Sequence, residues 1–360
     1  MDEQDEILRE GIKSVDLSGL KEYMDAGDEL GFPEMSLGDL IQKLLSGESL
    51  LDPAQIWSAF KELLLGEVQS ASLLGIQILT LCILVGMLEN LTNAFGEKAV
   101  SRVGSMICSY AVVGLCLVHF SQAYSICGDS VDSVSSAMQI LLPVLLPLII
   151  AVGGPASGGA LHPLILTSVT LFSTLIQKLI LPCMFFSCVF LLTNSLTEKD
   201  YVKKLALFLR SAGIFLTGLA VTLFSGITAL QGMVSKNADG MLAQTARYSI
   251  DNFVPIVGGF AADSLDLVLS CVGVIKNGVG IIGLLLIVAL LLVPILKLLA
   301  IAAIYKLTAV LTEPIGSKVI SDCMNELGNT IVFLAAVLFL TGILFLIFMT
   351  ILISIGSGDW

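Results

Sequence analysis

The sequence IIGLLLIVALLLVPILKLLAIAAI occupies residues 281–304 and decides the fold. Lys297 is its only charged residue, and the run exceeds the roughly 20 apolar residues that a helix needs to cross the hydrocarbon of a bilayer. Three further apolar stretches lie at residues 72–88, 202–223 and 331–353. Each stretch predicts a membrane-spanning helix. We therefore expect an all-α fold, a bundle of helices that crosses a membrane several times.

The composition of the whole chain supports this prediction. Hydrophobic residues make up 56% of the 360 residues and charged residues 13%, against roughly 25% charged residues in an average soluble domain. A soluble core cannot bury such an excess of apolar side chains. We assign residues 70–360 to the multi-pass membrane domain.

Residues 1–69 form a separate acidic region. They hold 16 Asp and Glu against 5 Lys and Arg, so they account for −11 of the chain's net charge of −12. An acidic region repels nucleic acid and anionic lipid headgroups, which bind through Lys and Arg. Ile56, Trp57 and Phe60 share one face at helical spacing, which predicts amphipathic helices here. These helices lie on the membrane or on the protein itself, or they dock a partner.

The membrane domain contains an internal repeat. A Leu-Thr pair ends an apolar span at Thr92, Thr197 and Thr312, and a short basic stretch and another apolar span follow each time. The threonine hydroxyl is suited to cap the helix that follows. The repeat units are residues 70–120, 139–229 and 251–355.

The basic residues predict the orientation of the chain. Short loops rich in Lys and Arg stay on the cytoplasmic side of a membrane, so we place all three Leu-Thr turns there. The acidic N-terminal region is then extracytoplasmic. The first residues, MDEQDE, have neither the basic nor the apolar part of a secretory signal. We therefore expect that a signal sequence is missing from this chain.

A glycine-rich segment in the second unit predicts a broken or re-entrant helix. The apolar run before it, residues 141–150, is short for a full crossing. Backbone that is broken at membrane depth must be buried in protein or line a wet cavity. In the third unit we expect corresponding breaks at Gly258-Gly259, Gly278 and Gly280. The candidate residues of the second unit are Gly153, Gly154, Pro155, Ser157, Gly158 and Gly159.

Three charged residues in apolar surroundings are candidates for function, because ionisable groups are costly at membrane depth. Asp263 and Asp266 are one helical turn apart, so they share a face and are able to relay a proton or bind a cation. Alternatively, they lie near the outer interface and are simply hydrated. Lys297 is expected to snorkel or to pair with an acid, with a gating role as the alternative.

The sequence contains no recognisable catalytic, cofactor-binding or metal-binding motif. His119 and His162 have no partners at metal-ligand spacing, so we expect ordinary polar contacts for both. The eight cysteines include no CxxC pair, and most lie in apolar stretches, where free cysteines act as small buried hydrophobes. We expect no enzyme.

The order of these motifs resembles the stage III sporulation protein AE family. The resemblance spans nearly the whole chain, with the acidic region ahead of the motifs, and it depends on the overall pattern. The residues that carry it are Leu91-Thr92-Asn93-Ala94-Phe95-Gly96, Gly153-Gly154-Pro155-Ala156-Ser157-Gly158, Leu196-Thr197-Glu198 and Leu311-Thr312-Glu313-Pro314-Ile315.

The resemblance implies a multi-pass protein of the mother-cell membrane around the engulfed forespore. The family is expected to act with the other stage III sporulation A-operon membrane proteins and a forespore channel partner, in a channel or secretion-like complex that sustains forespore development. Its members begin with a cleaved signal peptide, in agreement with the predicted topology. We expect membrane lipid as a further partner and no nucleic acid. A homo-oligomer is possible as well.

Two rival functions remain open. A secondary transporter uses repeats, broken helices and acidic residues such as Asp263 and Asp266 at its binding site. A passive scaffold depends only on the residues of its docking surface. A fold alone does not separate these functions, because one fold serves many functions.

Overall fold

The computed structural model describes residues 98–152, 162–197, 200–253, 258–314 and 318–355, together with short helical pieces between residues 61 and 87. These five main ranges contain helices and no strand, which confirms the predicted all-α fold. The elements are α5 (Lys98–Ala151), α7 (His162–Leu175), the π-helix η2 (Ile176–Ile180), α8 (Leu181–Ser195), α9 (Lys203–Phe253), α10 (Gly258–Thr312) and α11 (Lys318–Ser354).

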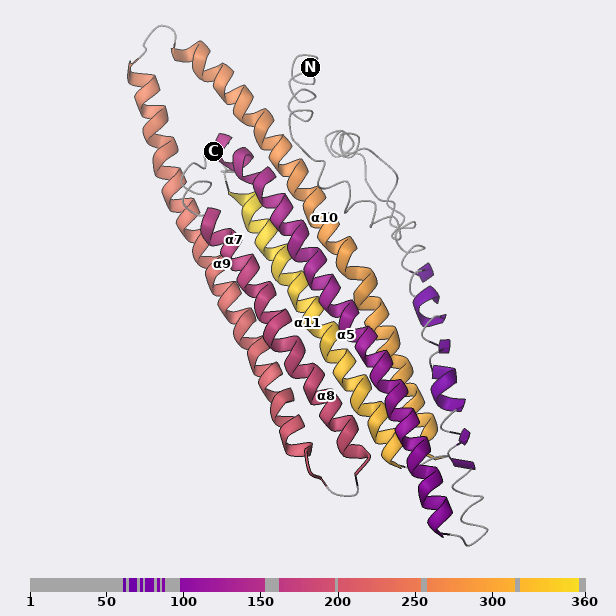
Figure 1. Cartoon of the computed structure of the whole chain (residues 1–360). Coiled ribbons are helices and arrows are strands. Elements are labelled where there is room, and N and C mark those ends of the chain that lie inside the picture. The colour runs from indigo at the N-terminus through magenta and orange to yellow at the C-terminus, as the bar shows by residue number, and fades with distance from the viewer. Residues whose placement is uncertain are drawn as a thin grey trace.

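The long helices lie side by side and alternate in direction (Figure 1). At one end of the bundle, α8 and α10 end and α9 and α11 begin; we call it the turn end. At the opposite end, the hairpin end, α5 and α9 end and α7 and α10 begin. The turns that follow α8 and α10 therefore lie on the same side of the bundle, as the repeat predicted. The turn at Thr92 lies outside the described residues.

Five described stretches are long and apolar enough to cross a membrane. The shortest has 29 residues and the longest 43. At about 1.5 Å per residue these helices are about 44–65 Å long, more than the roughly 30 Å of bilayer hydrocarbon. The bundle therefore extends beyond the hydrocarbon. The stretches are Ser109–Ala151, Pro163–Ser195, Lys203–Gln231, Ser270–Thr312 and Ile320–Ser354.

From the sequence we expected residues 141–150 to be a short apolar run before a helix break. In the structure they are the last part of α5, one helix of 54 residues. The sequence reading began the run at Leu141 because polar residues precede it. Asp132 and Gln139 face outward, while Val131, Val134 and Met138 on the inner side are buried, so the helix stays packed. The predicted break at residues 153–159 lies outside the described residues.

The breaks predicted at Gly278 and Gly280 do not occur, because α10 is continuous from Gly258 to Thr312. Gly280 instead allows close packing: a Cβ atom there would overlap the side chain of Ile353 in α11. Small residues let membrane helices approach closely, since packing is a main source of helix association in lipid. Gly280 therefore serves helix contact rather than a turn.

The helical segment that begins with α7 at the hairpin end and ends with α8 at the turn end is interrupted at η2. This single π-helical turn joins α7 to α8, and Pro182 follows it in the first turn of α8. Turns of this kind inside α-helices occur frequently at functional sites. The sequence analysis did not predict this one.

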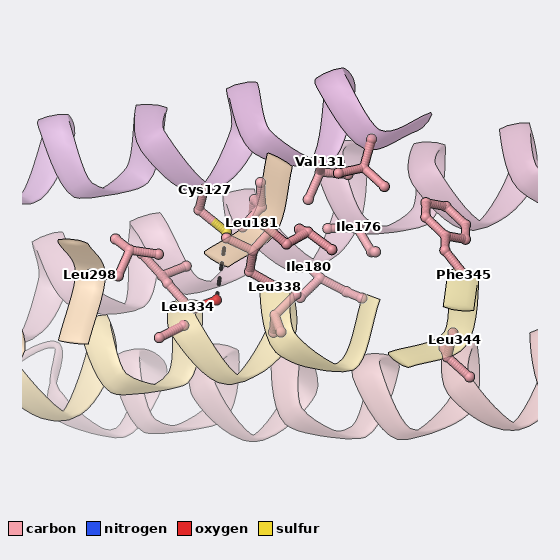
Figure 2. Packing of buried hydrophobic residues seen from close by; sticks show 14 of the residues in the cluster. Cys127, Val131, Ile176, Ile180, Leu181, Leu298, Leu334, Leu338, Leu344 and Phe345 are labelled. Carbon is pink, nitrogen blue, oxygen red and sulfur yellow. Dashed lines mark hydrogen bonds between the residues drawn. The ribbon is translucent and has the colours of Figure 1, made fainter. Parts of the chain in front are cut away.

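The core runs along the centre of the bundle, where side chains from four long helical segments interdigitate (Figure 2). Cys127 of α5, Leu181 of α8, Leu298 of α10 and Leu334 of α11 meet at one level and are buried. Nearer the hairpin end an aromatic cluster fills the core, with ring centroids 4.7–5.8 Å apart. It consists of Phe172, Phe224, Phe345 and Phe348.

The outer side of α9 is strongly apolar. Phe208 and Phe215 are 67% and 69% exposed, and Leu205, Leu219 and Leu223 are exposed as well. A surface of large apolar side chains is typical of a helix that faces lipid. This side of α9 is therefore the clearest lipid-facing surface of the bundle.

Candidate functional site

The threonines of two repeat turns make the same contact. The hydroxyl of Thr197 donates to the carbonyl of Asn194 at 2.8 Å, and the hydroxyl of Thr312 donates to the carbonyl of Ala309 at 3.1 Å. Both bonds run three residues back along the chain. They therefore close the helix that ends at the turn, whereas we predicted that the threonines cap the helix that follows.

A buried asparagine organises the turn between α8 and α9. The amide of Asn194 donates to Asp200 at 2.9 Å, and its carbonyl oxygen accepts the backbone N–H of Val202 at 3.2 Å. The amide hydrogen bond holds the pKa of Asp200 below its ordinary value of 3.8, and Lys203 lowers it further. Lys203 and Lys204 are exposed at this end of the bundle.

The first residues of α11 tie the two described turns together. The thiol of Cys323 donates to the hydroxyl of Ser195 at the end of α8, at 2.7 Å. The hydroxyl of Ser321 donates to the carbonyl of Ala309 near the end of α10, at 2.8 Å. These contacts fix α11 against both preceding helices at the turn end.

An ion pair joins α9 and α11 about one helical turn farther from the turn end than Cys323. Nη1 of Arg210 lies 2.6 Å from Oε2 of Glu326, with side chains that are 21% and 39% exposed. A charge at the edge of the hydrocarbon is costly unless it is paired. The pair therefore makes both charges tolerable and links helices of the second and third units.

Two polar residues singled out in the sequence find partners in the described chain. Nδ1 of His119 lies 3.2 Å from the hydroxyl of Tyr305, and both side chains are buried. Lys297 pairs with Glu67 at 3.7 Å. Both contacts agree with the expected polar contact for His119 and the expected acidic partner for Lys297.

A second group of polar residues lies near the middle of the bundle, where α5 passes η2. The amide of Gln177 donates to Asp132, and the hydroxyl of Ser125 donates to Asp129 at 3.0 Å. Both aspartates are exposed, and so is Lys178. The sequence analysis missed this group, although the rule that selected Asp263, an ionisable residue in an apolar span, applies equally here.

A buried lysine near the hairpin end was also missed. Lys276 is 0% exposed, and its Nζ donates to the carbonyl of Ile355 at the end of α11, at 2.5 Å. The adjacent Asn277 buries an Oδ1 atom without a hydrogen-bond partner. The lysine thus satisfies a carbonyl that the end of α11 would otherwise leave unpaired.

Several predicted site residues cannot be placed. Asp263 and Asp266 belong to α10, but their side chains lie outside the described residues, as does that of His162. Thr92 and the glycine-rich residues, from Gly153 to Gly159, lie outside them as well. The structure therefore does not test a role for the aspartate pair or for the glycine-rich segment.

Two small hollows lie among the described helices, one lined by α7, η2, α9 and α11 and the other by α7 and α9. Each has a volume of about 10 Å³, about the size of one water. In the described ranges no group of three His, Cys, Asp or Glu side chains could hold a metal ion. The described cysteines are unbridged, and all except the half-buried Cys183 are buried: Cys116, Cys127, Cys188, Cys271 and Cys323.

These features define a multi-pass α-helical membrane protein whose helices are tied together by polar contacts at the turn end. Residues 35–356 match the family described as Stage III sporulation protein AE. The chain belongs to this family, and it is therefore a sporulation protein of a membrane.

A curated relative supports the assignment. The chain is similar to the Stage III sporulation protein AE of Bacillus subtilis (strain 168), with 30% identity over 326 residues. The match covers 90% of this chain and 81% of the relative. No solved structure matches the chain.

Proposed function

We propose that this chain is a non-enzymatic membrane component of a channel or secretion-like complex that links the mother cell and the forespore and sustains forespore development. The family match over residues 35–356, in a chain with five described spans, is the observation that carries the proposal. The family is described by its part in sporulation and not by a reaction.

The proposed location is the mother-cell membrane around the forespore, with the turn end on the mother-cell side. Two observations support this orientation. The described turns share one end of the bundle, and the exposed Lys203 and Lys204 lie there. Exposed lysines at short turns favour the cytoplasmic side. The acidic N-terminal region then faces the space between the two membranes.

The orientation is tested by thiol labelling in intact cells that produce the protein. Ser14→Cys is expected to react with a membrane-impermeant thiol reagent. The matched control is Tyr201→Cys in the described turn, where the native side chain is 73% exposed. It should react only after the membrane is permeabilised. The parent chain, with its native cysteines, gives the background, and protection of Ser14→Cys together with labelling of Tyr201→Cys would reverse the orientation.

The proposed partners are the other stage III sporulation A-operon membrane proteins and a forespore channel partner. A tagged chain purified from sporulating cells in mild detergent should bring these proteins with it. A tagged membrane protein of similar abundance that acts outside sporulation is the control. Recovery of the chain without any of these proteins, under conditions that keep other membrane complexes intact, would contradict the proposed role.

A further inference from the structure

The outward side of α5 is polar over the middle of the helix. Its exposed positions recur every three or four residues, so the side chains form a single stripe along the helix. On α9 the exposed residues include large apolar ones such as Phe208 and Phe215, and the exposed polar residues beyond its first turn, Ser211, Thr222 and Ser225, carry no charge. The stripe, which we call the α5 polar stripe, consists of Ser121, Gln122, Ser125, Asp129, Asp132 and Gln139.

Two contacts fix the depth of this stripe against α11. The thiol of Cys127 donates to the carbonyl of Leu334 at 3.6 Å (Figure 2). Farther along, Leu141 and Met349 both lie within 3.2 Å of a Cβ atom built at Gly283, so these two side chains are at one level. Asp129 and Asp132 lie between those levels. The matching part of α11, residues 334–349, contains no charged residue.

The stripe is therefore at membrane depth, where lipid does not solvate it. Carboxylates in transmembrane helices face the interior of an assembly or a water-filled space and are paired there. In the described chain Asp132 has the amide of Gln177 and Asp129 has the hydroxyl of Ser125, but neither aspartate has a cationic partner. Contacts from outside the described chain are needed to neutralise these charges.

The neighbouring η2 supplies the opposite charge on the same side of the bundle. Gln177 of η2 reaches Asp132, and the next residue, Lys178, is exposed and has no ion pair in the described chain. One surface thus carries unpaired charges of both signs. Such a surface is complementary to another copy of itself, whereas a purely acidic one would require a basic partner.

The stripe also lets another helix come close. A Cβ atom at Gly114, on the same outward side, would meet nothing within 4 Å, and Ser121 and Ser125 are small. Interfaces between membrane helices are enriched in Gly, Ala and Ser, and hydroxyl and amide side chains form hydrogen bonds across them. The sequence of the stripe has the composition of such an interface.

We propose that a second copy of this chain packs on the α5 polar stripe within the membrane, with Lys178 of one copy facing Asp129 of the next. The serine and glutamine side chains of the stripe then bind their counterparts across the contact. The contact buries the charges that a single copy presents to lipid. It does not require the other sporulation proteins, so its failure and that of the proposed channel role are distinguishable.

The test is photo-cross-linking in membranes from cells that produce this chain alone. A photo-reactive amino acid at Gln122 should give a product that contains two copies, identified by its mass and by two different tags. The matched control is Leu219 on the apolar side of α9, which is 43% exposed. It should give no such product. A product of Gln122 with lipid only, or with another protein, would overturn the proposal.

Charge exchange tests the pairing itself. Asp129→Lys and Lys178→Asp should each lower the yield of the two-copy product severalfold, because each places like charges opposite one another. The double variant should restore the yield. Membrane levels of all variants are measured, and Asp129→Asn replaces the reversal if that variant does not insert. Yields that stay unchanged in both single variants, or that are not restored in the double variant, contradict the pairing.

Discussion

Replacement of Gly283 by leucine should destabilise the bundle, because at this position α10 packs against side chains of both α5 and α11. A Cβ atom there would lie 2.8 Å from the terminal methyl of Met349 and 3.0 Å from a methyl of Leu141. Ordinary contacts between carbon atoms are about 3.5–4.0 Å. Leucine adds further carbons beyond Cβ, so the side chains of Met349 and Leu141 would both have to shift.

The size of this effect can be worked out from two opposing contributions. Overpacking in a tight core typically costs about 1–3 kcal/mol, and two separate helices obstruct the new side chain, so we take the upper part of that range. Leucine gains back about 0.5–1 kcal/mol over glycine in a helix. The expected net loss is about 1–2 kcal/mol, which corresponds to a fall of about 2–6 °C in the midpoint of thermal unfolding.

The assay is thermal unfolding of the purified protein in detergent, with two controls. Gly218→Leu makes the same chemical change on α9 where nothing lies within 4 Å, so its midpoint should stay level or rise slightly. Met349→Ala should partly relieve Gly283→Leu, which appears as a coupling of at least about 1 kcal/mol in a double-mutant cycle. If Gly283→Leu unfolds at the same temperature as Gly218→Leu, the glycine is not a packing residue and the reasoning is wrong.

Three further predictions concern charged residues. A double-mutant cycle with Arg210→Met and Glu326→Gln should give a coupling of about 1 kcal/mol, at the level of a partly exposed pair, and zero coupling would show that the pair does not hold α9 to α11. The lowered pKa of Asp200 implies that its contribution to the turn is complete above about pH 4 and is lost as pH falls through the pKa in the folded state. Thermal stability should therefore drop in acid by less in Asp200→Asn than in the parent chain, and equal drops would contradict this. Asp263→Asn with Asp266→Asn should leave sporulation frequency unchanged under the proposed function, whereas a loss of spores would favour ion-coupled transport.

The helical fold and the relative direction of several helices follow from the sequence. The apolar runs at residues 281–304 and 331–353 lie within described spans, the run at residues 202–223 coincides with a third except for its first residue, and the Leu-Thr turns after α8 and α10 lie at one end, as predicted. These predictions succeed because bilayer thickness fixes the minimum length of a span and because lipid forces backbone hydrogen bonds into helices. Both constraints act on local sequence alone.

Glycine was the main source of error. The sequence reading took Gly278 and Gly280 as helix breaks, yet α10 runs through both. A glycine in an apolar helix either ends it or admits a neighbouring helix, and only the position of the neighbour decides between the two. Ile353, which fills the space beside Gly280, lies far away in the sequence. Local patterns cannot supply that information.

The polar residues at membrane depth were missed for a different reason. Asp129 and Asp132 lie in a stretch rich in Ser between the first two predicted repeat units, and Lys178 lies in an apolar stretch of the second unit. The outward side of α5 carries the two aspartates, while its inward side is largely apolar and packs in the core. A helical-face analysis of residues 109–151 would separate the two sides, since the polar positions recur every three or four residues.

The distribution of polar groups bears on how a channel component of this kind could work. Two hollows beside α7 and α9 have volumes of about 10 Å³ each, about the size of one water. The charges of α5 and η2 that have no ion pair in the described chain lie instead on the outside. A contact that uses these charges would form between chains and not in the core of one. On this view, variants that loosen the core, such as Gly283→Leu, should lower stability and function together. Charge variants at Asp129 should impair function while the purified chain remains as stable as the parent.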